Sequence, residues 1–119
     1  MHTRIFFGTI QSDKSQEALA VLNDFVDRAK QLPGCLLAQL MQNGSEIVGI
    51  STWATKEDLA SYAESELARE LFSKITPLFM GRPTVRSYEV KRSLSESAIV
   101  KSFSVMQLPG GVLREVIED

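Results

Sequence analysis

Hydrophobic and polar residues follow the period of a strand in some stretches of the chain and that of a helix in others. Residues 3–10, TRIFFGTI, are rich in β-branched and aromatic side chains and are apolar on both faces, which predicts a buried strand. After a polar break, apolar residues recur at spacings of three and four over residues 15–32, which predicts an amphipathic helix. Pro33 and Gly34 follow and predict the end of that helix.

Two further apolar runs lie on either side of an Asn-Gly pair. Residues 35–42, CLLAQLMQ, and residues 46–53, EIVGISTW, each have the length and composition of a strand. Asn43 and Gly44 both tolerate positive φ, so we expect a type I′ turn and an antiparallel hairpin. Both faces of the second run are apolar, and periodicity therefore does not tell which face carries Trp53.

The next stretch is helical in pattern but interrupted. Residues 55–58, TKED, have the form of a capping box, in which a hydroxyl and a carboxylate each satisfy a backbone N–H at a helix start. Two apolar stripes follow, separated by polar residues 64–66, where Ser65 can cap again, so we expect two short helices or one kinked helix. A Gly-Arg-Pro turn at 81–83 ends this zone, and residues 84–91 alternate like a fourth strand.

The order of these elements is β-α-β-β-α-β, which predicts an α+β, ferredoxin-like domain over residues 1–91, with a four-stranded antiparallel sheet and helices on one face. A sheet covered on one face only is polar on the other, whereas the first three strands are apolar on both. We therefore expect the second face to meet another subunit. Residues 92–119 form an extension that we expect to pack on the dimer as an arm or hairpin, because residues 98–108 are too apolar for a solvated tail.

Composition and charge narrow the classes of partner and site. The chain has 119 residues, is 44% hydrophobic and carries a net charge of −2, so no basic surface for nucleic acid or anionic membrane is expected. No apolar run approaches the roughly 20 residues of a membrane span and no export signal is visible, so we expect a cytoplasmic protein. With one cysteine, Cys35, and one histidine, His2, at the start of the chain, we expect neither an internal disulfide nor a metal site.

A family resemblance rests on the central part of the chain. Pro33-Gly34 before the second strand, a third strand closing in Trp53, a capped turn into Leu59-Ala60-x-Tyr62 and a serine at Ser65 together resemble the antibiotic biosynthesis monooxygenase family. The likeness covers about residues 3–91. It implies a homodimeric α/β barrel in which two ferredoxin-like sheets face each other and each subunit keeps a pocket between its sheet and its helices.

The resemblance also implies a type of chemistry. Members of the family include cofactor-independent oxygenases of polycyclic phenols, quinols or anthrones, and haem-degrading enzymes. The first group implies a monooxygenase without a cofactor that acts on a small aromatic substrate, although the asparagine that such oxygenases place four residues before the tryptophan is Gly49 here. The haem-degrading members use an asparagine on strand one, which this chain lacks, and a tryptophan and a histidine where Tyr62 and Phe72 stand. The resemblance therefore does not extend to haem degradation.

Two residues are candidates for catalysis. Trp53 corresponds to the strand-three tryptophan used in some pockets of this family, and its alternative role is that of a large core or interface residue. Tyr62 lies on the same apolar stripe as Leu59, so its hydroxyl either serves as a donor or acceptor in the pocket or finds a partner in the core.

Four further residues are candidates for contact with substrate. Phe7 and Phe72 are expected to pack and to line the pocket, and Gly49 is a strand glycine of the kind that allows a ligand to approach closely. Arg86 can bind a phenolate or carboxylate, with pairing to Glu89 or to a partner subunit as the alternative. The chain thus supports two functions, the oxygenase and a non-catalytic dimeric barrel that binds a small apolar ligand or acts as an interaction module.

Overall fold

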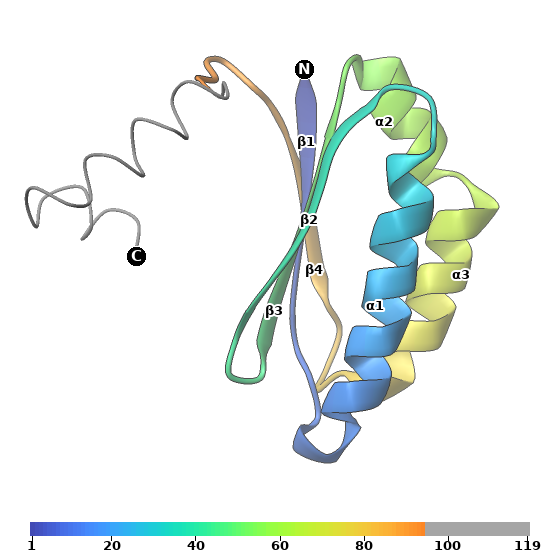
Figure 1. The fold of residues 1–119 in the computed structure, drawn as a ribbon, viewed down its shortest axis with the longest axis vertical. Helices are drawn as coiled ribbons and strands as arrows, with labels where there is room; N and C mark the ends of the chain where they lie inside the picture. The colour runs from blue at the N-terminus through green and yellow to red at the C-terminus, as the bar shows by residue number, and fades with distance from the viewer. Residues whose placement is uncertain (95–119) are drawn as a thin grey trace, which may run out of the picture.

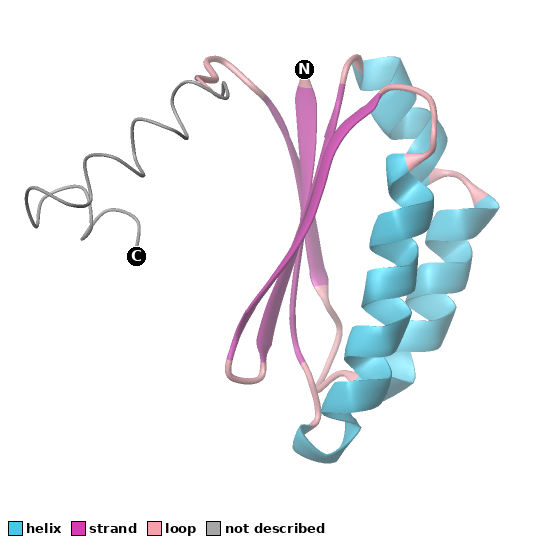
Figure 2. Ribbon diagram, in the orientation of Figure 1, coloured by secondary structure: helices cyan, strands magenta, loops and turns pink. Residues whose placement is uncertain are grey.

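The computed structural model describes residues 1–94 and contains one four-stranded antiparallel sheet with helices on one face, as Figure 1 and Figure 2 show. The predicted ferredoxin-like order is confirmed. The strands are β1 (His2–Thr9), β2 (Cys35–Asn43), β3 (Glu46–Trp53) and β4 (Thr84–Glu89). The helices are α1 (Ser15–Lys30), α2 (Lys56–Ala63) and α3 (Glu66–Ile75), with 3₁₀ turns at Ser12–Lys14 and Thr76–Leu78. The predicted arm at 92–119 lies, apart from its first three residues, outside the described part of the chain.

The strands are ordered β2-β3-β1-β4, which places β1 and β3 at the centre of the sheet. Phe6 of β1 lies opposite Gly49 of β3 and opposite Val85 of β4. In this register the even-numbered residues of β1 and the odd-numbered residues of β3 point to the same face. That face is the one beneath the helices, because Phe6 is buried while its neighbour Phe7 is 42% exposed.

The hairpin between β2 and β3 forms where the sequence predicts it, but its turn is different. Asn43 is still part of the ladder and pairs with Glu46, so the loop consists of Gly44 and Ser45. Gly44 has φ +62°, and no residue other than glycine has positive φ in the described chain. The predicted type I′ turn over Asn43 and Gly44 is therefore wrong, because positive φ at the first loop position alone is the pattern of a type II′ turn.

Two side-chain caps divide the second helical region into α2 and α3. The Thr55 hydroxyl accepts a hydrogen bond from the Asp58 N–H at 3.0 Å, and the Ser65 hydroxyl accepts one from the Ala68 N–H at 3.2 Å. The prediction of two short helices with a second cap at Ser65 is confirmed. Only half of the capping box forms within residues 1–94, because the Asp58 carboxylate packs against Gly34 instead of returning a bond to Thr55.

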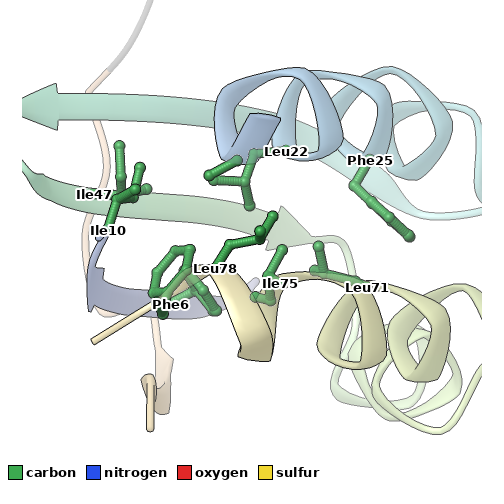
Figure 3. Close-up of a cluster of buried hydrophobic side chains, with 10 residues drawn as sticks. Phe6, Ile10, Leu22, Phe25, Ile47, Leu71, Ile75 and Leu78 are labelled. Carbon is green, nitrogen blue, oxygen red and sulfur yellow. The ribbon is translucent and has the colours of Figure 1, made fainter. Parts of the chain in front are cut away.

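A hydrophobic cluster joins the sheet to α1 and α3, and Figure 3 shows its side chains. The Phe6 ring from β1 meets the rings of Phe72 and Phe79 edge to face, at centroid distances of 6.0 and 5.6 Å. Ile47 and Ile75 are completely buried in this cluster. Each such side chain stabilises the fold by about 1.5–3 kcal/mol through burial. No helix within residues 1–94 is long and apolar enough to cross a membrane.

The two faces of the sheet therefore differ in their cover. We call the face beneath the helices the covered face and the other the open face; Figure 1 shows all three helices on the same side of the strands. The open face keeps large apolar groups in contact with solvent. These are Phe7, Leu37, Met41 and Tyr88, with exposed fractions of 42%, 39%, 44% and 50%.

Candidate functional site

A pocket lies between the covered face and the helices. Phe6 from β1, Phe25 from α1 and Phe72 from α3 form part of its largely apolar wall. It is partly open to solvent and leaves a space of about 70 Å³. An apolar cavity of about 150 Å³ is known to hold one benzene molecule. The pocket as it stands therefore suits part of a small ring system, with the remainder in the opening.

Three polar residues of the pocket lie together at one end of it. Ser51 of β3 lies directly opposite Arg4 of β1 in the sheet, and both residues line the pocket together with Tyr62 from α2. The Arg4 guanidinium carbon is 5.9 Å from the centre of the Tyr62 ring, within the range of a cation–π contact. The pocket thus has an apolar body and a polar end.

Trp53 lies behind this polar end. Its side chain is completely buried on the covered face, which settles the face that periodicity left open. Its indole ring stacks on the Tyr62 ring at 4.8 Å with an interplanar angle of 20°, and its Nε1 donates a hydrogen bond to the Ser51 hydroxyl at 3.0 Å. Trp53 does not line the pocket itself; it lines a separate groove with Leu32 and Pro33. The structure places Trp53 where it holds Tyr62 and Ser51 in position.

Tyr62 is the residue that connects the stack with the pocket. Its side chain is 9% exposed, and its hydroxyl makes no hydrogen bond to another residue within 1–94. Burial raises the pKa of the Tyr62 phenol, and the nearby positive charge of Arg4 opposes part of this rise. The phenol is therefore protonated at neutral pH and can donate a hydrogen bond to a bound molecule.

Arg4 was not among the residues predicted from the sequence. Its side chain is half-buried, and burial lowers the pKa of the guanidinium while Tyr62 partly restores it. No carboxylate of residues 1–94 forms an ion pair with it. The sequence carried a weak signal, because Arg4 is the one charged residue in the first predicted strand. Its meaning depends on the pairing of β1 with β3 and on the packing of α2.

His2 is a second polar residue of this region that the sequence did not indicate. The sequence places it at the start of the chain, but β1 begins with it, opposite Trp53 of β3 and Glu89 of β4. Its Nδ1 atom is buried and has no hydrogen-bond partner within residues 1–94. His2 therefore belongs to the polar end of the covered face, although it is not part of the pocket wall.

Gly49 and Phe72, two of the predicted contact residues, line the pocket together. A Cβ atom built on Gly49 would lie 3.7 Å from the Phe6 Cβ and 3.8 Å from its Cδ1, which are ordinary contact distances. The absence of a side chain at this position is therefore not required by close packing. It leaves open space at the floor of the pocket.

Phe7 and Arg86, the other two predicted contact residues, lie on the open face. Arg86 of β4 is exposed and stands opposite Ile5 of β1, and with Phe7 and Tyr88 these residues line a separate hollow. The predicted alternative partner of Arg86, Glu89, forms an ion pair with Lys91 at 2.6 Å. The structure therefore does not bring Phe7 and Arg86 together with Tyr62, Gly49 and Phe72.

Comparison with known proteins places the chain in a family. The sequence profile of the antibiotic biosynthesis monooxygenases matches residues 1–74, which is more than half of the chain. The chain belongs to the antibiotic biosynthesis monooxygenase family. No protein of curated function matches it by sequence. The resemblance predicted from Trp53, Tyr62 and the turns around them is thus confirmed.

Several solved structures share the fold. A candidate antibiotic biosynthesis monooxygenase from Nitrosomonas europaea superposes with a TM-score of 0.71 at 14% identity, over 77% of this chain and all of the other. One from Deinococcus radiodurans gives a TM-score of 0.74 at 11% identity, over 81% of this chain and 98% of the other. A protein from Mycobacterium tuberculosis gives 0.73 at 16% identity, over 79% and 98%. At such identities the likeness shows the antibiotic biosynthesis monooxygenase fold alone.

Proposed function

We propose that this protein is a cofactor-independent monooxygenase that oxidises a small phenol, quinol or anthrone in the pocket beneath α1 and α3. The observation that carries the proposal is the Tyr62 phenol: its ring is buried, it is protonated at neutral pH, and its hydroxyl is accessible and has no partner within residues 1–94. A tyrosine of this kind on an apolar wall suits an aromatic substrate that bears one oxygen to be oriented. Membership of the family supports the same reaction class.

The reaction needs no redox group from the protein when the substrate itself supplies the electrons. An anthrone methylene loses two hydrogens; one atom of O₂ becomes the new carbonyl oxygen and the other leaves as water with those hydrogens. Removal of a proton from the substrate precedes the transfer of electrons to oxygen. The contribution of the protein is then to exclude water, to orient the ring and to favour the ionised substrate.

The residues take distinct parts in this proposal. Tyr62 donates a hydrogen bond to the substrate oxygen and is the catalytic residue. Trp53 is a positioning residue, because it contacts Tyr62 and Ser51 but not the pocket. Gly49 leaves room for the substrate ring, and Phe72 packs against the edge of the substrate ring.

The proposed assembly is a cytoplasmic homodimer formed through the open faces of two sheets. Phe7, Leu37, Met41 and Tyr88 support it, because exposed apolar groups gathered on one sheet face are typical of an interaction surface. Arg86 then acts at the subunit interface instead of in the pocket beneath the helices. Sedimentation at micromolar concentration tests this assembly, and a stable monomer would exclude it.

Oxygen uptake with a panel of hydroquinones and anthrones tests the oxygenase, and the two tyrosines of the chain provide a matched pair. We expect Tyr62→Phe to lower kcat/KM by about tenfold or more, because it removes one hydrogen bond that orients the substrate. Tyr88→Phe, on the open face, is the control and retains the rate. Equal rates for both variants would exclude the role of Tyr62. No turnover above buffer across the panel would exclude the oxygenase.

The second candidate is a non-catalytic barrel that binds a small apolar molecule. Gly49 favours it, because family oxygenases carry an asparagine at this position and this chain does not. Mass spectrometry of molecules that co-purify with the native protein separates the two candidates when the panel shows no turnover. An aromatic ligand recovered unchanged after incubation in air would identify the protein as a binding module.

A further inference from the structure

Among residues 1–94, Arg4 is the only charged residue in the wall of the pocket beneath the helices. It lies half-buried on the covered face of the central strand β1, between Ser51 of β3 and Ser87 of β4. Bringing a charge out of water into such a place is unfavourable unless the charge is compensated. A guanidinium at this position therefore needs compensating partners, either within the protein or in a ligand.

The contacts of Arg4 within residues 1–94 compensate its charge only in part. The Arg4 guanidinium carbon lies over the Tyr62 ring at 5.9 Å, and no residue within 1–94 accepts a hydrogen bond from its N–H groups. Arg4 has no ion pair with any described carboxylate, whereas Arg28 on the outer surface has two, to Asp24 and Glu70. The arginine that is half-buried is thus the less compensated of the two. Its N–H groups are left for water or for a ligand.

The guanidinium, the Ser51 hydroxyl and the Tyr62 ring form the polar end of an otherwise apolar pocket. A guanidinium recognises a planar pair of acidic oxygens by two parallel hydrogen bonds, and a phenolate oxygen by one or two. An apolar wall that ends in such a group is complementary to a flat molecule with an acidic group at one end. A neutral hydrocarbon would leave the charge of Arg4 buried without a counterion.

We propose that the pocket selects aromatic anions and that Arg4 binds the acidic oxygens of the ligand, a carboxylate or a phenolate. This inference deepens the proposed function, because it rests on the same pocket and names the charge of its substrate. A positive charge at this end also favours the ionised form of a bound phenol, the form from which electrons pass to oxygen. The selection itself does not depend on turnover.

Benzoate and benzamide test the inference, since they have nearly the same shape and differ in charge. Binding is followed by NMR titration of the methyl groups of Leu22 and Leu71 in the full-length protein. We expect benzoate to bind at least about tenfold more tightly than benzamide, as one charge-assisted hydrogen bond provides. Arg4→Gln should abolish this preference, while Arg82→Gln, in an exposed turn, should leave it unchanged.

A second pair of probes separates the two kinds of anion. Para-nitrophenol ionises near neutral pH, and para-nitroanisole is its neutral counterpart. Tighter binding of the phenolate with no preference for benzoate identifies phenolate as the ligand class, and the reverse identifies carboxylate; either outcome supports selection by charge. Equal affinities within both pairs, or a preference that survives Arg4→Gln in a variant with native circular dichroism, would overturn the proposal.

The oxygen-uptake assay distinguishes a failure of this inference from a failure of the proposed function. Turnover of a hydroquinone that Arg4→Gln leaves unchanged, together with equal binding of benzoate and benzamide, would overturn anion selection and leave the oxygenase intact. Anion-selective binding without turnover of any substrate in the panel would support the inference and exclude the oxygenase.

Discussion

The same strands present two apolar faces, and only one of them is closed by the chain itself. On the covered face, Ile47 is completely buried beneath α1 and α3. On the open face, Phe7 of β1 is 42% exposed and Met41 of β2 is 44% exposed. Successive side chains of a strand point to opposite faces, so neighbours in sequence belong to different environments.

The comparison shows that the apolar side chains of this sheet lie in two different environments. The covered face provides the core and, where Gly49 and Arg4 interrupt it, a pocket. The open face gains nothing from apolar residues in an isolated subunit, because burial is what makes them stabilising. In the proposed function, association buries the open face and a ligand fills the pocket. Substitutions on the two faces separate these two proposals.

The largest effect is expected on the free energy of unfolding, where substitutions at two adjacent residues of β3 should differ. Ile47→Ala should lower the free energy of unfolding by about 2–5 kcal/mol, because it leaves a cavity in the core. Val48→Ala, on the open face, should change it by about 1 kcal/mol or less at concentrations where the protein is monomeric. Chemical denaturation measures both values. Equal losses for the two variants would contradict the assignment of faces.

Two strand glycines on the covered face should respond in opposite ways. A Cβ at Gly8 would overlap the ring of Phe79, so Gly8→Ala should destabilise the protein by about 1–3 kcal/mol. A Cβ at Gly49 meets only ordinary contacts with Phe6, so Gly49→Ala should leave stability unchanged or raise it by about 0.4–1 kcal/mol. Gly49→Ala should nevertheless weaken ligand binding, because its methyl group enters the pocket. Stability curves and an aromatic titration of both variants check this contrast.

A change on the open face should affect association more than folding. Phe7→Ser removes an exposed aromatic side chain, and we expect it to weaken dimer formation by about tenfold or more. Sedimentation equilibrium across a range of concentrations measures the effect, and Met80→Ser, an exposed residue before β4, is the control. Unchanged association for Phe7→Ser would place the subunit contact elsewhere.

The smallest effect concerns the outer surface, where Arg28 of α1 bonds Glu70 of α3 at 2.8 Å. The hydrogen bonds from Arg28 and Lys74 lower the pKa of Glu70 from 4.5 to about 2. Because the folded-state pKa is the lower one, the stabilisation is complete above pH 4.5 and is lost as the pH falls from there toward about 2. Thermal unfolding of Glu70→Gln should therefore differ slightly from the native protein at neutral pH, and the difference should vanish in acid and shrink in salt.

The elements of the fold could be predicted from local patterns, because each depends on residues near to it in sequence. The boundaries of β3 match the prediction, and Ser65 caps α3 as expected. The hairpin turn was predicted less well, since Asn43 and Gly44 tolerate several turns and the ladder between Asn43 and Glu46 selects one of them.

The site was predictable only in part, because it depends on which faces and strands come together. Tyr62, Gly49 and Phe72 do line one pocket, whereas Phe7 and Arg86 lie across the sheet from it. The face of Trp53 could not be read from a strand that is apolar on both sides. Arg4 became a candidate only when the pairing of β1 with β3 placed it opposite Ser51 and α2 placed Tyr62 beside it.

The position of a bound aromatic molecule tests the central claim most directly. Intermolecular nuclear Overhauser effects between alpha-naphthol and the methyl groups of the protein would locate it. We predict contacts with Leu22, Ala38 and Leu71, which line the pocket on the covered face. Contacts with Ile5 and Met41 of the open face, and none with Leu22 or Leu71, would contradict the assignment of the functional site.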